Sequence, residues 1–182
     1  MRALFRCIKV FLALAIFLVA LSPPGAGAAE KIGVLMLHGK AHGNKSIYHL
    51  SGRGLESAGF LVEMPSSTPW SPNRIYDRTY LGTLKEMDTA VDKLKAAGAT
   101  HVIVGGHSIG ANVALGYAAN RKGLAGLIVL GAGHFISGNF MGKKLGKDVA
   151  RAKDMIAAGK GKEMANFDDI NQRKTSSREM TA

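Results

Sequence analysis

The fold is decided by one stretch, HVIVGGHSIGAN, which spans His101 to Asn112. Its β-branched start predicts a buried strand, and the residues from Ala111 to Asn120 predict a helix. Between them lies the pattern G-x-S-x-G, formed by Gly106, Ser108 and Gly110. A strand that passes directly into a helix through such a turn predicts an α/β protein whose serine hydroxyl is exposed above the sheet.

The turn at Ser108 has the properties that a nucleophilic serine needs. We expect a strained backbone conformation that pushes the hydroxyl outward. Gly106 and Gly110 leave room where the strand and the helix pass close together. The helix N-terminus supplies N–H groups and a positive dipole end to a developing oxyanion, and the N–H of Ile109 is the expected donor. Taken as a bare string, the motif also fits a Gly-rich turn without chemistry.

A second motif follows the first expected strand, Ile32–Leu37. There His38 and Gly39 precede Lys40, whose backbone N–H is the expected second donor of an oxyanion hole. Alternatively, His38 only orders this turn. His38 and His42 are four residues apart, but no Glu follows His38 and no helix is predicted here, so we expect no metal site.

Apolar runs alternate with helical patterns along the chain. The expected strands are Ile32–Leu37, Phe60–Glu63, His101–Val104 and Leu124–Leu130, and the expected helices are Ser46–Ala58, one around Leu84–Leu94, and Ala111–Asn120. This order requires crossover connections and predicts a parallel sheet of about four strands with helices on both faces. The tail after Asp169 is polar and predicts no strand. Without a repeat or a linker, residues 29–182 are expected to form one domain.

Two segments, LMLHGK at Leu35–Lys40 and GGHSIG at Gly105–Gly110, resemble motifs of the α/β-hydrolase superfamily of serine esterases and lipases. Their separation by two helices and a strand also agrees, and the resemblance covers residues 31–135. It implies a three-layer fold and hydrolysis of a small-molecule acyl substrate through an acyl-serine, with no cofactor. The loop at Met64–Tyr80 would border the substrate pocket with Trp70 and Tyr76 as walls; alternatively, Trp70 is a core residue.

The chain departs from that family after Ser108. The family's triad continues with an acid and then a histidine, each after a later strand. Here His134 is the one later histidine and the one candidate base, and no acid lies near it in the sequence. Asp168 and Asp169 lie in a segment that we interpret as too polar for a strand end. We therefore expect missing C-terminal strands and an impaired enzyme; the alternative is a non-catalytic binding protein or an inactive remnant.

The first 28 residues predict a cleaved signal peptide. Basic residues precede an apolar run at Val10–Leu21, and Ala26-Gly27-Ala28 offers a small-residue cleavage site. The apolar run is too short for a stable membrane span. We therefore expect an exported protein, either periplasmic or secreted.

Composition and charge argue against several other classes of protein. Cys7 is the one cysteine, so no disulfide framework and no cysteine zinc site are expected. The net charge of +11 includes three basic residues of the leader. The other basic residues are scattered, and no aromatic residues lie within the looser group of basic residues from Lys143 to Lys162, so we expect no nucleic-acid partner. The segment Gly131-Ala132-Gly133 resembles the start of a dinucleotide loop, but Ile136 stands where its third small residue belongs. An open sheet edge would make the chain poorly soluble or dependent on a partner chain.

Overall fold

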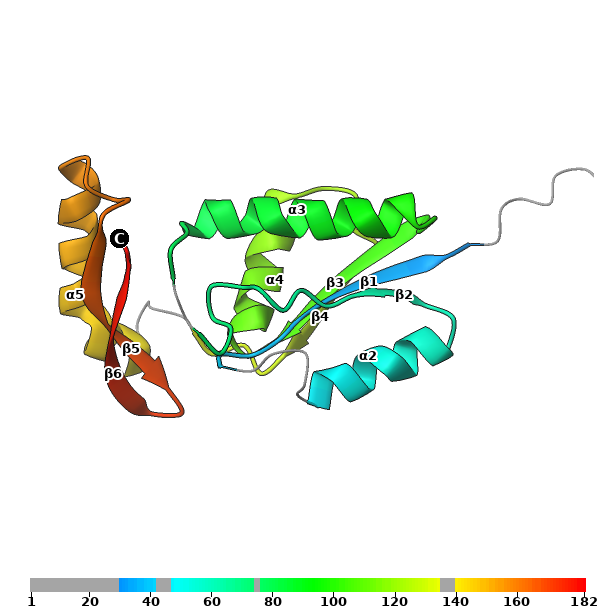
Figure 1. The fold of residues 1–182 in the computed structure, drawn as a ribbon, viewed down its shortest axis with the longest axis horizontal. Coiled ribbons are helices and arrows are strands. Elements are labelled where there is room, and N and C mark those ends of the chain that lie inside the picture. The colour runs from blue at the N-terminus through cyan, green and yellow to red at the C-terminus, as the bar shows by residue number, and fades with distance from the viewer. Residues whose placement is uncertain (1–29, 42–46, 74–75, 135–139) are drawn as a thin grey trace, which may run out of the picture. The chain divides into compact units, whose positions relative to one another are not determined.

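The computed structural model describes residues 30–41, 47–73, 76–134 and 140–182 (Figure 1). Their main part, Lys31–Ala182, forms one unit. The predicted leader and His42 lie outside the described residues. Among the residues that the structure describes, no helix has the length and the apolar character needed to cross a bilayer.

Four parallel strands form the sheet, which confirms the expected architecture. They are β1 (Ile32–Leu37), β2 (Leu61–Glu63), β3 (His101–His107) and β4 (Gly126–Leu130), in the spatial order β2-β1-β3-β4. The strand β3 extends three residues beyond the predicted end, because Gly105, Gly106 and His107 pair with β4. Strand β1, which is central in this order, is buried almost throughout, as a central parallel strand must be.

The direction of the crossovers decides which helix covers which face. From β1 the chain passes through α2 (Ile47–Ser57) to β2, and then through α3 (Tyr80–Ala96) back across β1 to β3. From β3 it continues through α4 (Ile109–Asn120) to β4. Right-handed crossovers in opposite directions place α2 on one face and α3 with α4 on the other, as Figure 1 shows.

The core lies between the sheet and the helices α3 and α4, which cover one of its faces. Its fully buried side chains include Leu35 and Leu37 of β1, Leu84 and Leu94 of α3, and Val104 of β3. The periodicity that predicted α3 is therefore the apolar face that packs on the sheet. Trp70 is 2% exposed and belongs to the same cluster, so it is a core residue rather than a pocket wall.

The C-terminal segment corrects the sequence prediction. After α5 (Phe140–Ala157), the chain forms an antiparallel hairpin of β5 (Met164–Asn171) and β6 (Lys174–Thr181). Asp168 and Asp169 thus lie inside a strand. The prediction was wrong because it relied on side-chain polarity, whereas backbone pairing between the two strands holds this hairpin together. Its turn residues Gln172 and Arg173 adopt positive φ angles of 50° and 66°, which suit a tight hairpin.

Strand β4 forms one edge of the sheet and pairs only with β3 among the described strands. Leu127, Val129 and Leu130 are exposed along it, by 39%, 41% and 42%. This is the apolar edge that the sequence predicted. An exposed strand of this kind favours association with another chain; dependence on a partner chain stays a prediction.

Candidate active site

The topology brings the two sequence motifs together. Chain connections leave β1 toward one edge of the sheet and leave β3 toward the other, although the two strands are neighbours. Such a switch point opens a crevice at the carboxyl ends of the strands, where ligands bind in open α/β sheets. Leu37 pairs with Gly106 at this end, so the segments that follow them, His38–Lys40 and Ser108, lie at the same end of the sheet.

Ser108 occupies a strained turn between β3 and α4. Its φ of 54° and ψ of −122° lie where residues with a side chain rarely occur. Its N–H donates to the carbonyl oxygen of Leu130 at 2.9 Å, which fixes the turn to the end of β4. A Cβ atom on Gly106 would lie 2.4 Å from the carbonyl carbon of Gly110, and one on Gly110 would lie 2.4 Å from the oxygen of Leu37. The expected strain and close approach are therefore confirmed.

His134 lies beside the serine, in the loop after β4. Its Nε2 is 3.1 Å from Ser108 Oγ, within hydrogen-bond distance. Asn112, in the first turn of α4, fixes this loop, because its Oδ1 accepts from the N–H groups of Gly133 and His134, each at 3.1 Å. The histidine that the sequence offered as a candidate base is thus within reach of the serine proton.

Burial sets the protonation state of His134. Burial lowers the pKa of this half-buried imidazole below its ordinary value of 6.5, the positive charge of Lys40 lowers it further, and the negative charge of Asp169 opposes both. A lowered pKa means that the neutral form prevails at pH 7. In that form Nε2 can accept a proton, as a general base must.

The two expected oxyanion donors belong to the segments that follow β1 and β3. Ile109 is the first residue of α4, where N–H groups have no partner within a helix. Lys40 lies in a loop held by two hydrogen bonds of 2.8 Å, from Ala41 N–H to the oxygen of Trp70 and from Trp70 Nε1 to the oxygen of His38. The side chain of Lys40 is buried and pairs with Asp169 Oδ1 at 2.5 Å, which the sequence did not predict.

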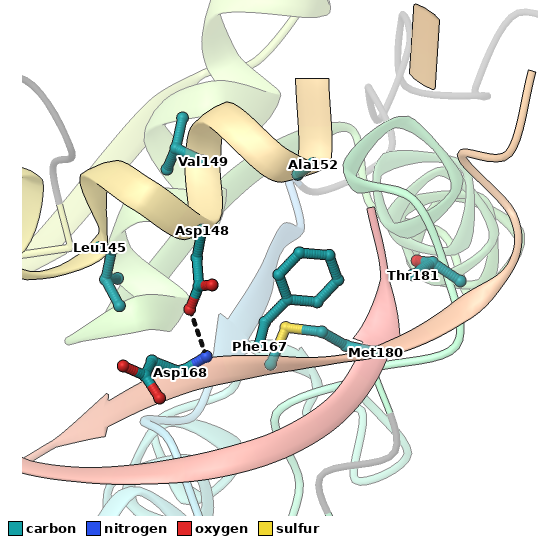
Figure 2. A pocket seen from close by; sticks show the side chains of 8 residues that line it. All are labelled: Leu145, Asp148, Val149, Ala152, Phe167, Asp168, Met180 and Thr181. Atoms are coloured by element: carbon teal, nitrogen blue, oxygen red, sulfur yellow. Dashed lines mark hydrogen bonds between the residues drawn. The ribbon is translucent and has the colours of Figure 1, made fainter. Parts of the chain in front are cut away.

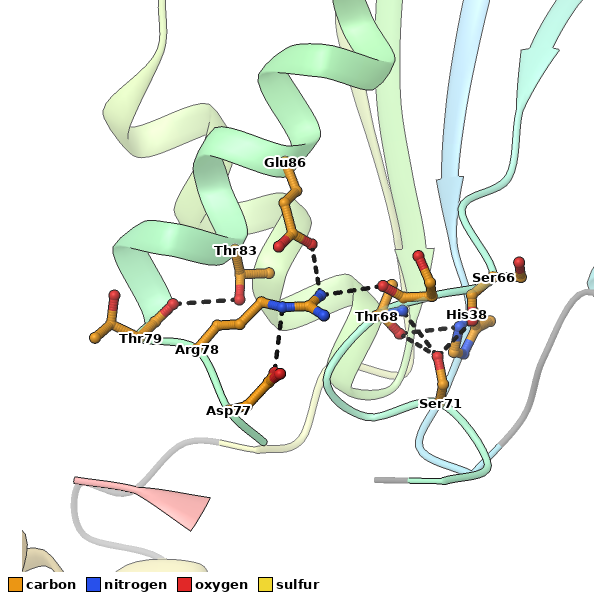
Figure 3. Close-up of polar contacts among 10 residues, drawn as sticks. His38, Ser66, Thr68, Ser71, Asp77, Arg78, Thr79, Thr83 and Glu86 are labelled. Carbon is orange, nitrogen blue, oxygen red and sulfur yellow. Dashed lines mark hydrogen bonds and ion pairs between the residues drawn. The ribbon is translucent and has the colours of Figure 1, made fainter. Parts of the chain in front are cut away.

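His38 has a structural role in the same loop. Its Nδ1–H donates to the oxygen of Gly39 at 2.8 Å, and its Nε2 lies 3.0 Å from Thr68 Oγ1. Figure 3 shows how the loop with Ser66, Thr68 and Ser71 gathers at His38. The histidine thus orders the β1 turn and anchors the Pro- and Ser-rich loop to it. The structure brings no metal-binding group of three or more His, Cys, Asp or Glu together in the part of the chain that it describes.

An apolar pocket of about 160 Å³ lies between α5 and the β5–β6 hairpin. Leu145 and Val149 of α5 line it together with Phe167 and Met180 of the hairpin. Figure 2 shows these side chains, and Asp148 accepting from the N–H of Asp168. The distance between Asp168 N and Asp148 Oδ2 is 2.6 Å. Phe167 and Asp169 share one face of β5, because side chains two residues apart on a strand point the same way. Phe167 thus lines the pocket, and Asp169, two residues further along the same strand, pairs with Lys40.

The roles of two residues of the site, Asn112 and Asp169, were not predicted from the sequence. Asn112 lies in an apolar helix, and an amide in the first helical turn after the turn at Ser108 is a local signal that could have been used. Asp169 gives no such signal, because 129 residues separate it from Lys40.

Substitution of Asn112 tests whether it positions His134. Asn112→Ala removes an acceptor from two N–H groups, so we expect unfolding free energy to fall by about 1 kcal/mol and any ester hydrolysis to fall about tenfold through misplacement of His134. Asn112→Asp keeps an oxygen acceptor and should retain most of both. Thermal unfolding and p-nitrophenyl acetate hydrolysis measure the two effects. Equal activity in Asn112→Ala and the parent chain would contradict the role.

Comparison with known proteins gives structural neighbours only. No family model and no curated protein matches the chain. Among solved structures it is similar to the α/β hydrolase GrgF from Penicillium sp. sh18, with a TM-score of 0.55, 16% identity, and coverage of 80% of this chain and 52% of that one. It is also similar to a thermostable carboxyl esterase from Bacillus coagulans, solved with glycerol, with a TM-score of 0.50, 22% identity, and coverage of 76% and 46%.

A putative hydrolase from Agrobacterium vitis S4 gives a TM-score of 0.50 at 18% identity, with 83% of this chain and 57% of that chain covered. The chain thus spans about half the length of the structures that it matches. At these identities the likeness concerns the fold alone. The chain has the α/β-hydrolase fold.

Proposed function

We propose that the chain is a serine hydrolase that cleaves small-molecule esters through an acyl-serine, with Ser108 as nucleophile and His134 as general base. The observation that carries this proposal is the distance of 3.1 Å between Ser108 Oγ and His134 Nε2. The strained turn and the lowered pKa of His134 support it, because they expose the hydroxyl and keep the imidazole neutral. The solved esterase among the structural neighbours lends the substrate class.

The proposed reaction needs these groups in sequence. Ser108 Oγ attacks the ester carbonyl carbon while His134 Nε2 takes the hydroxyl proton. The N–H groups of Ile109 and Lys40 would stabilise the oxyanion that forms. The tetrahedral intermediate collapses, the carbon–oxygen bond to the alcohol breaks, and His134 returns the proton to the departing oxygen. Water then repeats the same steps, which releases the carboxylic acid and restores Ser108.

The proposed enzyme is slow. Among the described residues, no carboxylate hydrogen bonds to His134 to complete a triad, and removal of triad members from a serine hydrolase costs on the order of 10⁴- to 10⁶-fold in kcat. His134, which is held by the loop after β4, would restore part of this lost kcat. We therefore expect measurable hydrolysis of activated esters at a rate far below that of a complete triad.

A fluorophosphonate probe tests the proposal directly. It should label the full chain at Ser108 by forming a phosphonyl-serine with loss of fluoride, and Ser108→Ala should abolish the labelling. His101→Ala is the matched histidine control, because His101 is exposed at the opposite end of β3 and should label like the parent. A folded chain that resists the probe would instead favour a non-catalytic binding protein with this fold.

The pocket between α5 and the hairpin is proposed to receive the acyl chain. Ala152→Phe would fill it, so KM for a long-chain p-nitrophenyl ester should rise about tenfold while that for the acetate ester stays unchanged. Ala157→Phe is the matched control, because Ala157 lies exposed at the end of the same helix and outside the pocket. An equal rise for both esters in Ala152→Phe would contradict this assignment.

A further inference from the structure

Lys40 and Asp169 form an ion pair that is buried on both sides. Lys40 Nζ lies 2.5 Å from Asp169 Oδ1, and the two side chains are 6% and 4% exposed. The same ammonium donates to the carbonyl oxygen of Ile170 at 2.9 Å. Exposed ion pairs contribute little, but removal of one partner from a buried pair leaves an uncompensated charge. This pair is therefore a fixed electrostatic feature of the molecule.

The pair connects two segments that lie far apart in the sequence. Lys40 belongs to the loop after β1, which holds the expected oxyanion donor, and Asp169 belongs to β5. A main-chain hydrogen bond of 3.1 Å from Thr181 N–H to the oxygen of Tyr76 ties β6 to the loop before α3. The hairpin is thus held at two places, and one of them is the edge of the site.

Both members of the pair act on His134. The charge of Lys40 lowers the pKa of His134, and the charge of Asp169 raises it. His134 hydrogen bonds to the hydroxyl of Ser108 and to the side-chain amide of Asn112, and both groups are uncharged at neutral pH. Among the described residues, the charges that reach the imidazole are therefore the two halves of one ion pair.

We propose that Lys40 and Asp169 are positioning residues of the site, whose ion pair fixes the β1 loop beside Ser108 and balances the charge that His134 meets. This inference rests on the proposed function. When His134 takes the serine proton it becomes a cation, and an unpaired ammonium nearby would oppose that step. Asp169 cancels this opposition, and Lys40 in turn prevents Asp169 from holding the imidazole in its protonated form.

The test compares Asp169→Asn, Lys40→Met and the double variant in the full chain. NMR titration of the His134 imidazole reports its pKa without any need for activity, and the acidic limb of the kcat/KM profile reports it during turnover. Asp169→Asn should lower the pKa of His134, Lys40→Met should raise it, and the double variant should return it close to the parent value. A general base supplies roughly 10²- to 10⁴-fold, so Asp169→Asn should cost a part of this, about tenfold in kcat with little change in KM.

Lys160→Met serves as the matched control. Lys160 belongs to an exposed pair with Glu163, so its removal should leave the pKa of His134 unchanged. Shifts in one direction for both single variants, or no shift in either, would overturn the proposal. Where a single variant does not fold, the double variant still decides, because it contains no uncompensated buried charge; a His134 pKa far from the parent value there overturns the proposal as well.

Fluorophosphonate labelling separates this inference from the proposed function. Opposite shifts that cancel, in a chain whose Ser108 resists the probe, would refute the hydrolase and leave the charge balance in place. Labelling of Ser108 without the shifts would refute the charge balance alone.

Discussion

Replacement of His134 by alanine is expected to lower kcat for p-nitrophenyl ester hydrolysis by about 10²- to 10⁴-fold, which is the contribution of a well-placed general base. The reason is geometric: Nε2 of His134 lies 3.1 Å from Ser108 Oγ, and without it the hydroxyl keeps its proton at neutral pH. KM should change little, because the imidazole acts on the serine rather than on the bound ester. Steady-state kinetics of the purified chain measure both constants.

The control for this variant is His101→Ala, which removes an exposed histidine of the same sheet and should leave kcat as it is. Imidazole in the buffer should restore part of the activity of His134→Ala, since the vacated site borders the serine. Comparable kcat values for His134→Ala and the parent chain would mean that another group takes the serine proton.

Local patterns explain why the sheet and the strained turn at Ser108 could be predicted. The strand before Ser108 and the helix after it are signalled by adjacent residues, and the glycines at 106 and 110 mark the close approach that the structure contains. The parallel order follows from strands that alternate with helices. Here sequence and structure agree because each signal lies within one element.

The parts that the sequence missed depend on contacts between distant elements. Asp169 looked too polar for a strand, yet its carboxylate is buried because the ammonium of Lys40, 129 residues away, accompanies it. The role of Asn112, which holds the loop after β4 and with it His134, was likewise not predicted. A local pattern can single out a residue such as Asn112, but it does not report the partner, because the partners of a buried polar group are brought together only when the chain folds.

Substitution of Gly110 by alanine is expected to affect stability and activity together. A Cβ atom there would lie 2.4 Å from the oxygen of Leu37 and 2.6 Å from that of His38, and both are backbone atoms at the end of the central strand β1. Backbone in a buried strand cannot move aside as a flexible side chain would. We therefore expect a loss of unfolding free energy of roughly 1–3 kcal/mol, as is typical of overpacked cores.

The same substitution should lower kcat because α4 would have to move away from β1. Its first residue, Ile109, carries the expected oxyanion donor, and a displacement of about 1 Å at a reacting centre costs on the order of 10²-fold. Gly54→Ala provides the matched comparison, because a Cβ atom there meets nothing within 4 Å, and alanine in a helix should add about 0.5–1 kcal/mol of stability. Chemical denaturation and ester hydrolysis of the two variants distinguish the cases. If Gly110→Ala behaves like Gly54→Ala, then β1 and α4 do not approach each other as closely as the site requires.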